Sequence, residues 1–282
     1  MSETRPRKFH RTRGRAEAMW RKSGSVWQQS TAGDVWDRLS SVDFMNQALL
    51  LAAVMLLWLF PNLIFLAAVT GRDFAESVSQ KMGLNAEATQ SVDSLFKSSS
   101  TSVAATVGAI AFLVLAVLAT VAVIQKIWQT IWGLEGLGYW RESWQQFLWG
   151  FGALGVGAGL SYMEQALSDI DHFLAALASF LLLAAFFWLG MRLLLAGRVP
   201  YRKLIVPACV TSVFFLGLGA FSAAFLSDAI IANDKEYGPI GVVFIIMTWL
   251  LAVGVVFILG PVVGVALQER WARRKRKQAR AA

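Results

Sequence analysis

Six long apolar segments, separated by charged flanks, constrain this 282-residue chain more than any other feature. A helix needs about 20 apolar residues to cross the roughly 30 Å hydrocarbon layer of a bilayer, and such runs are hard to place in a soluble core. Continuous apolar runs also favour helices over barrel strands, whose polarity alternates. The sequence therefore predicts an all-α, polytopic membrane protein with six transmembrane helices, near residues 44–70, 102–124, 146–163, 172–196, 204–227 and 239–266.

The basic residues are distributed unevenly between the flanks of these segments. Of the 26 Lys and Arg residues, 22 fall in flanks that six crossings place on one side of the membrane, and that side has a net charge of +14. The other side has a net charge of −6. Cytoplasmic flanks are enriched in Lys and Arg, so both termini are predicted to be cytoplasmic. Removing the short, glycine-rich segment 146–163 would move eleven basic residues to the other side, which favours keeping it as a span.

The chain divides into one membrane domain and two tails. Residues 1–33 are predicted to form a disordered, basic cytoplasmic tail, residues 34–268 the six-helix membrane domain, and residues 269–282 a second basic cytoplasmic tail. The cluster from Arg273 to Lys277 is interpreted as an anchor beside a negatively charged leaflet rather than as a nucleic-acid site.

Two cytoplasmic amphipathic elements are predicted within the membrane domain. Around residues 34–43, apolar side chains recur at helical spacing, which indicates a short helix lying on the inner surface. Residues 125–145 contain four tryptophans, and tryptophan prefers the headgroup zone, so an in-plane elbow is expected there. The side chains on which these two predictions depend are Val35, Trp36, Leu39 and Val42 for the first, and Ile127, Trp128, Ile131, Trp132, Trp140, Trp144 and Phe147 for the second.

Polar residues inside the spans are candidates for a substrate site, because burying them in lipid is costly without a partner. Pro61 removes a backbone donor beside Asn62 in the first span, and Thr248 and Trp249 lie near the middle of the last. A packing kink with a locally bonded amide is the alternative for the first pair. Gly260 and Gly264 have the spacing of a close helix contact, as do Gly155 and Gly159 in the third span.

A basic group near the end of the fourth span is a candidate site for a lipid headgroup. Arg192, Arg198, Arg202 and Lys203 could hold a phosphate through charge-assisted hydrogen bonds, or serve only to fix the topology.

Motifs for catalysis are not evident in the sequence. It has two histidines and one cysteine, Cys209, which is expected to pack inside the fifth span. No metal-ligand cluster, catalytic triad or nucleotide-binding loop is found in a suitable context. The sequence therefore predicts no enzyme activity, no metal and no cofactor.

The chain resembles the YihY/BrkB family of bacterial inner-membrane proteins. The resemblance lies in six spans, in Phe60-Pro61, in the run from Tyr237 to Gly241 and in Thr248-Trp249. It implies a multi-pass plasma-membrane protein of envelope integrity, and it adds Tyr237 to the candidate substrate site. The ribonuclease label once given to some members is considered mistaken.

Two departures from the family pattern accompany the resemblance. Residues 260–264 stand where members often have Gly-Ala and an acidic residue, and an Asn-Arg pair is not evident around Gln125 and Lys126. The leading hypothesis is a transporter or flippase-like handler of a lipid or amphipathic envelope component. The alternative is a non-transporting scaffold for envelope-assembly proteins. Membrane lipids are the expected partners and nucleic acid is not, while the sequence does not indicate the substrate or the oligomeric state.

Overall fold

The computed structural model describes residues 31–70, 103–166 and 172–281, and within these ranges every regular element is a helix. The predicted all-α class is therefore confirmed, whereas almost all of the predicted tail 1–33 lies outside the described residues. The helices are α2 (Thr31–Ser41), α3 (Phe44–Thr70), α6 (Val103–Ile131), α7 (Tyr139–Ala166), α8 (His172–Leu194), α9 (Tyr201–Tyr237) and α10 (Pro239–Ala281).

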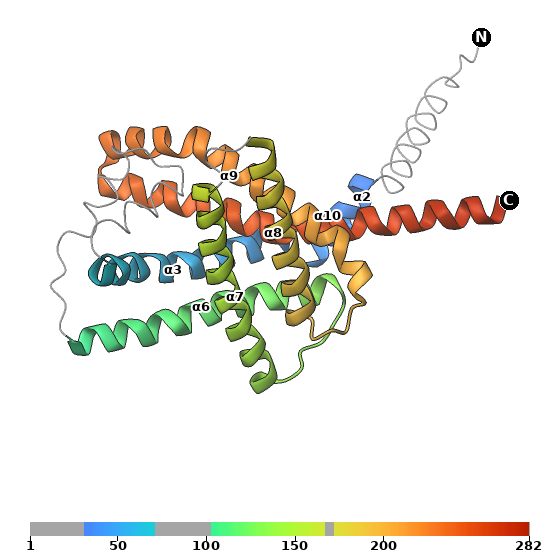
Figure 1. Ribbon diagram of the computed structural model, residues 1–282, viewed down its shortest axis with the longest axis horizontal. Helices are drawn as coiled ribbons and strands as arrows, with labels where there is room; N and C mark the ends of the chain where they lie inside the picture. Colours follow the sequence, from blue (N-terminus) through green and yellow to red (C-terminus); the bar gives the residue numbers. More distant parts are fainter. Residues whose placement is uncertain (1–30, 71–102, 167–171, 282) are drawn as a thin grey trace, which may run out of the picture.

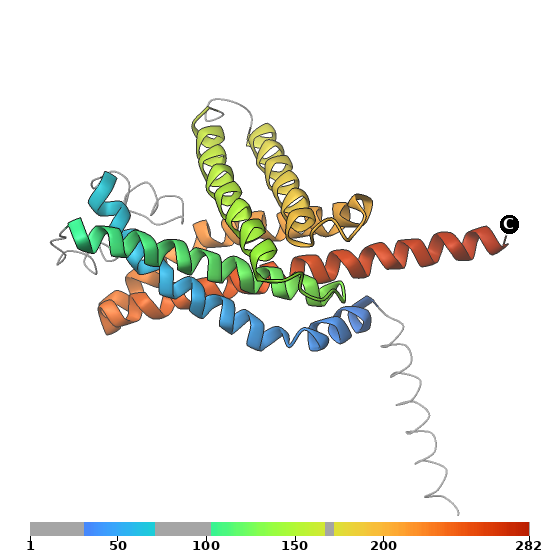
Figure 2. The ribbon, with the colours of Figure 1, turned by 90° about the horizontal axis from the view of Figure 1, so that it is seen from below.

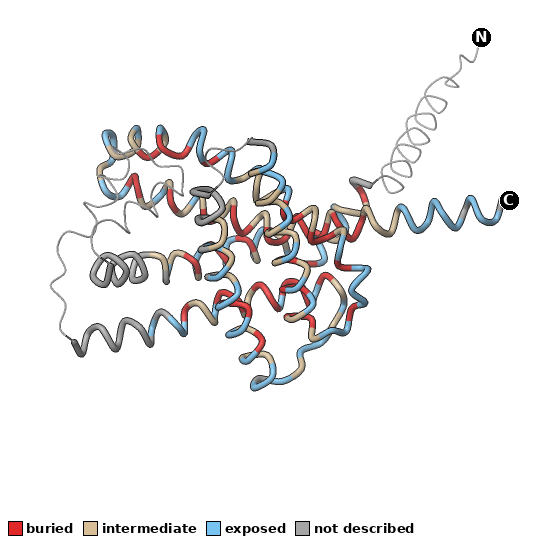
Figure 3. The backbone as a smooth tube through the Cα atoms, in the orientation of Figure 1, coloured by how far each residue is buried: buried red, intermediate tan, exposed pale blue. Residues whose placement is uncertain are grey.

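The helices fall into two groups by direction. α3, α6, α9 and α10 follow the long axis of the molecule, while α7 and α8 cross them steeply as an antiparallel pair (Figures 1 and 2). α10 contacts α9, α3, α2 and α6, and α8 joins the crossing pair to α9. Buried residues accordingly concentrate where the two groups meet (Figure 3).

The described residues contain four helices that are long and apolar enough to cross a membrane. A fifth crossing is obtained if α2 and α3, which meet at a bend of 56°, are counted as one span. α7 is not among them within the described residues. A membrane-type helical protein is confirmed, and the finer prediction of six spans with cytoplasmic termini stays a prediction. The four are Val114–Ile131, Leu174–Leu194, Tyr201–Tyr237 and Pro239–Arg280.

Large apolar side chains cover much of the outside of the described helices. A helix that is apolar on every face has no solvent-adapted side, and contiguous exposed apolar surface of this extent marks contact with lipid or protein. Examples from α6, α8, α9 and α10 are Phe112, Leu115, Leu181, Leu189, Phe221, Phe225, Ile240 and Phe244.

Several helices continue beyond the apolar segments. α6 reaches Ile131, α9 reaches Tyr237 and α10 reaches Ala281, whereas the predicted spans end at 124, 227 and 266. The added residues of α10 are mainly Arg, Lys, Gln and Ala, which are strong helix formers and include neither Gly nor Pro. Hydropathy marks the part of a helix that suits lipid, and the helix itself ends where its backbone is interrupted.

Close backbone approach fixes α10 against its neighbours. A Cβ atom added to Gly260 would lie 2.7 Å from Cα of Thr211 in α9, and one added to Gly264 would lie 2.8 Å from N of Pro207. Thus the first predicted glycine pair lies at a helix contact. The second predicted pair, Gly155 and Gly159, does not make a close helix contact at both positions, because a Cβ at Gly155 would have nothing within 4 Å among the described residues.

A tight turn joins α9 to α10 within the run from Tyr237 to Gly241. Gly238 has φ 63° and ψ −151°, a region open essentially to glycine alone, and its N–H donates to O of Asp234. Pro239 then begins α10, where a missing N–H costs nothing. Gly238 and Pro239 therefore form the turn of a helical hairpin made by α9 and α10.

Trp128 corrects the predicted elbow at 125–145. α6 occupies the first part of this stretch, up to Ile131, and Trp128 is fully buried there, with Nε1 donating to O of Phe257 in α10 at 3.2 Å. Pro261 has no N–H to offer that carbonyl, which lies four residues earlier, so α6 supplies the donor. Only the later part of the stretch matches an exposed aromatic face, with Trp140 87% and Trp144 68% exposed.

α2 also differs from a helix that lies only on a lipid surface. Leu39 and Val42 are buried in the protein core, whereas Trp36 is 66% exposed. Nη2 of Arg38 bonds Oε1 of Glu269 at 2.7 Å and so fastens α2 to α10. The apolar stripe found in the sequence therefore packs mainly on protein.

We expect Trp128→Phe to lower the free energy of unfolding by about 1–3 kcal/mol, because it leaves a buried carbonyl without its donor. In a Pro261→Ala background the helix regains its own N–H, and the same substitution should cost clearly less. Denaturant titration of the detergent-solubilised protein measures both. Trp271→Phe, at an exposed site on α10, is the control. An equal loss in the two backgrounds would contradict this account.

Candidate functional site

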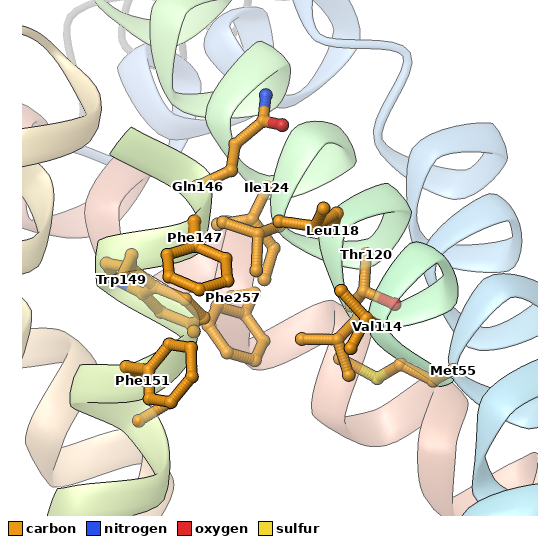
Figure 4. A pocket seen from close by; sticks show the side chains of 14 residues that line it. Met55, Val114, Leu118, Thr120, Ile124, Gln146, Phe147, Trp149, Phe151 and Phe257 are labelled. Carbon is orange, nitrogen blue, oxygen red and sulfur yellow. The ribbon is translucent and has the colours of Figure 1, made fainter. Parts of the chain in front are cut away.

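An apolar groove of about 420 Å³ lies between α6 and α7 (Figure 4). α6 lines one wall between Val114 and Ile124, and α7 lines the other between Gln146 and Ala153. Met55 of α3 and Phe257 of α10 complete the lining. This volume falls within the range of small-molecule sites, which are typically apolar with a few polar groups.

Aromatic rings form the wall contributed by α7. Trp149 packs edge-on to Trp128 with the ring centroids 6.4 Å apart, and its centroid lies 5.2 Å from that of Phe186. A Cβ at Gly190 would lie 2.9 Å from Cδ1 of Trp149, so only glycine leaves room for the indole against α8. Nε1 of Trp149 is buried and has no partner among the described residues. These contacts set the position of α7.

A network of amides closes one end of the groove. Nε2 of the buried Gln125 donates to Oε1 of Gln145 at 3.1 Å and to O of Leu194 at 2.9 Å. Oε1 of Gln125 accepts from Nε2 of Gln146 at 2.8 Å, and Gln146 also lines the groove. Figure 4 places Gln146 at the end of the groove away from Phe151. The arrangement joins α6, α7 and α8 and provides a polar end to an apolar site.

The turn between α6 and α7 is fastened by a carboxylate. Oε1 of Glu142 accepts from Nε2 of Gln129 at 3.0 Å and from N of Leu137 at 2.8 Å. The guanidinium of Arg198 donates to O of Glu135 in the same turn. The turn that follows the amide network's part of α6 is therefore fixed both by Glu142 of α7 and by Arg198, which precedes α9.

The predicted substrate residues whose side chains the structure describes, Tyr237, Thr248 and Trp249, do not line this groove. The side chains of Pro61 and Asn62 are outside the described part of the chain, although α3 is helical there. Tyr237 is exposed at the end of α9, and the exposed Thr248 donates to O of Phe244 in its own helix. Trp249 packs partly against the core, with a buried Nε1 that has no partner among the described residues.

None of the predicted headgroup residues lines the groove. Arg192 is exposed on the last turns of α8, and Arg198, Arg202 and Lys203 follow it into α9. Arg198 bonds backbone carbonyls, while Cζ of Arg202 lies 5.7 Å from the centroid of the Tyr201 ring. The group therefore lies at the end of the molecule where α8 ends and α9 begins.

A spacing pattern in the sequence marks the residues of the amide network. Gln125 and Gln129 are one turn apart at the end of an apolar segment, and Glu142 and Gln146 repeat that spacing in the next helix. In the described ranges, no group of three or more His, Cys, Asp or Glu side chains is placed to hold a metal ion.

Comparisons with known proteins give one match. A family model described as Virulence factor BrkB matches residues 35–282, most of the chain. No curated protein and no solved structure matches.

We expect Gln125→Leu to destabilise the protein by about 1–3 kcal/mol, because the carbonyl of Leu194 and the amide oxygen of Gln145 both lose their donor. The matched control is Gln268→Leu, since that exposed amide makes a single bond to O of Arg202, and its effect should stay within about 0.5 kcal/mol. Denaturant titration in detergent gives the stabilities, and hydrogen exchange should rise at the start of α7. Similar values for the two variants would show that the network adds little.

Proposed function

The chain belongs to the BrkB family, and from that premise we propose that it is a transporter or flippase-like protein of the bacterial plasma membrane. Its substrate is a lipid or another amphipathic component of the envelope, and its contribution is to envelope integrity. The observation that carries the proposal is the groove between α6 and α7, which is lined by apolar side chains apart from Gln146 at one end and the hydroxyl of Thr120. An amphipathic molecule likewise has an apolar chain and a polar group at one end.

The position of the groove supports movement of such a molecule rather than a catalytic role. Its two walls belong to helices of different direction, since α6 follows the long axis and α7 crosses it (Figure 2). Side chains at its edge, including Val114 and Phe151, are exposed where the outer surface is apolar. A molecule could enter from the bilayer without passing through water. The proposal assigns no chemical reaction to the protein.

We also propose six crossings with both termini in the cytoplasm. The support is that the basic flanks meet at one end of the fold. Arg38 bonds Glu269, Gln268 bonds O of Arg202, and Arg198 bonds O of Glu135, so these contacts join all four flanks. The turn at Gly238 lies at the opposite end of α10 (Figure 1). Placing the basic end in the cytoplasm satisfies the positive-inside rule.

A scaffold role is the second candidate, and the C-terminal part of α10 favours it. From Trp271 onward the described side chains are exposed, and this part of the helix projects beyond the rest of the fold (Figures 1 and 3). A projecting basic helix presents a surface to an acidic envelope-assembly protein. Such a protein would hold partners without moving lipid.

Labelling of single cysteines tests the topology. In a Cys209→Ala background, an impermeant maleimide added to intact cells should modify Asp93→Cys, and it should modify Arg280→Cys only after the membrane is opened. Labelling of Arg280→Cys in intact cells would reject a cytoplasmic C-terminus.

Reconstitution into vesicles tests transport. Wild-type protein should move fluorescently labelled lipids or envelope precursors, with neutral or anionic heads, between leaflets faster than protein-free vesicles do. Val114→Trp should slow this movement several-fold, because the indole fills the groove, whereas Leu115→Trp should not. Both positions are exposed on α6, and only Val114 lines the groove. If wild-type protein moves none of these molecules, the scaffold is favoured.

A further inference from the structure

We propose that the groove between α6 and α7 holds one hydrocarbon chain of an amphiphile whose uncharged head donates a hydrogen bond to Oε1 of Gln146. This inference rests on the proposed function for its membrane setting, and it specifies the class of substrate. The head is a hydroxyl or a similar neutral donor, in contrast to the phosphate that the basic residues near α8 suggest.

The lining of the groove excludes a charged head within it. None of the residues that line it is ionisable, and the only amide or hydroxyl side chains among them are Gln146 and Thr120. Moving a phosphate or carboxylate from water into such a site is costly unless a cation or several donors meet it. Carbon and aromatic side chains suit a hydrocarbon chain, which needs no polar partner.

The hydrogen bonds already made by the polar groups favour a neutral hydroxyl. Nε2 of Gln146 donates one of its two hydrogens to Oε1 of Gln125, and no described residue donates to Oε1 of Gln146. The hydroxyl of Thr120 donates to O of Ala116, which leaves its oxygen as an acceptor. A hydroxyl can donate to Oε1 of Gln146, and it can also accept from the second Nε2 hydrogen. An anionic oxygen would find at most that one N–H donor and no cation.

The groove is continuous with apolar surface on both walls. Leu115 beside Val114 on α6 is 66% exposed, and Phe147 and Phe151 are exposed on α7 with their ring centroids 4.6 Å apart. A surface of this kind faces lipid in the proposed setting. The occupant is therefore an amphiphile of the bilayer.

The basic residues near α8 are a separate feature. Arg198 is used by carbonyls of Leu195 and Glu135, and Arg202 lies over the Tyr201 ring. Neither lines the groove. An anionic head held there would not place Oε1 of Gln146 in contact with a donor.

Photolabelling tests the inference in vesicles containing the full-length protein. Two probes with the same diazirine-bearing hydrocarbon chain are compared, a fatty alcohol and the matching fatty acid at mildly alkaline pH. The alcohol should label α6 between 114 and 124 and α7 between 146 and 153 more strongly than the acid does. Val114→Trp should reduce this labelling several-fold, and Leu115→Trp should leave it unchanged.

Gln146→Leu separates recognition of the head from folding. Loss of the acceptor should lower labelling by the alcohol to the level of the acid and leave the acid unchanged. Equal losses for both probes would mean that the variant only disturbs the groove, and the assignment to Gln146 would then be wrong. Stronger labelling by the acid in wild-type protein, or labelling that Val114→Trp does not change, would overturn the proposal.

The outcomes also separate this inference from the proposed function. Labelling in the groove without lipid movement would retain the inference and reject transport. Lipid movement without labelling in the groove would retain transport and reject the inference.

Discussion

Polar groups buried in this fold must find partners within the protein, because lipid offers none and the exterior is apolar. The two best examples lie close together in sequence. Pro261 releases the carbonyl of Phe257, and Trp128 occupies it. Gln125, less than one turn away in α6, bonds Gln145, Gln146 and the carbonyl that ends α8. The C-terminal part of α6 thereby connects α7, α8 and α10, and the direction of the crossing pair depends on it.

The groove follows from that arrangement. α7 is held to α6 at Gln125 and to α8 at Gly190, yet it crosses α6 instead of running beside it. Two helices that cross steeply touch over a short length, and their walls diverge beyond the contact. The amides occupy the contact and apolar side chains line the space beyond it. A site with one polar end is therefore a geometric result of how the two helices are fastened.

The sequence predicts more of the fold than of the site. Long apolar segments identify the helical class and the family, because hydropathy depends on residues that are near one another in the chain. The hydrogen-bond partner of Trp128 is 129 residues away in the chain, so local hydropathy does not reveal it. Tryptophan as a residue type predicts a position at the membrane interface, whereas this indole is buried in the protein. The groove likewise joins residues of four helices. A hydroxyl within an apolar span, such as that of Thr248, predicts a polar partner at a site, but its own helix provides the partner. Hydropathy alone also does not predict that α7 and α8 cross the other helices.

The length of α10 has an electrostatic consequence in the proposed orientation. Its 43 residues extend about 65 Å, roughly twice the thickness of the hydrocarbon layer. The segment from Trp271 to Arg280 adds about 14 Å to the distance from the bundle, while physiological salt screens charges beyond about 8 Å. While the helix keeps its direction, Arg270 lies within reach of the electrostatic potential of the anionic leaflet, and Arg280 lies beyond it. The distal charges of this basic segment would therefore be neutralised by salt in solution and remain open to exchange with other anions.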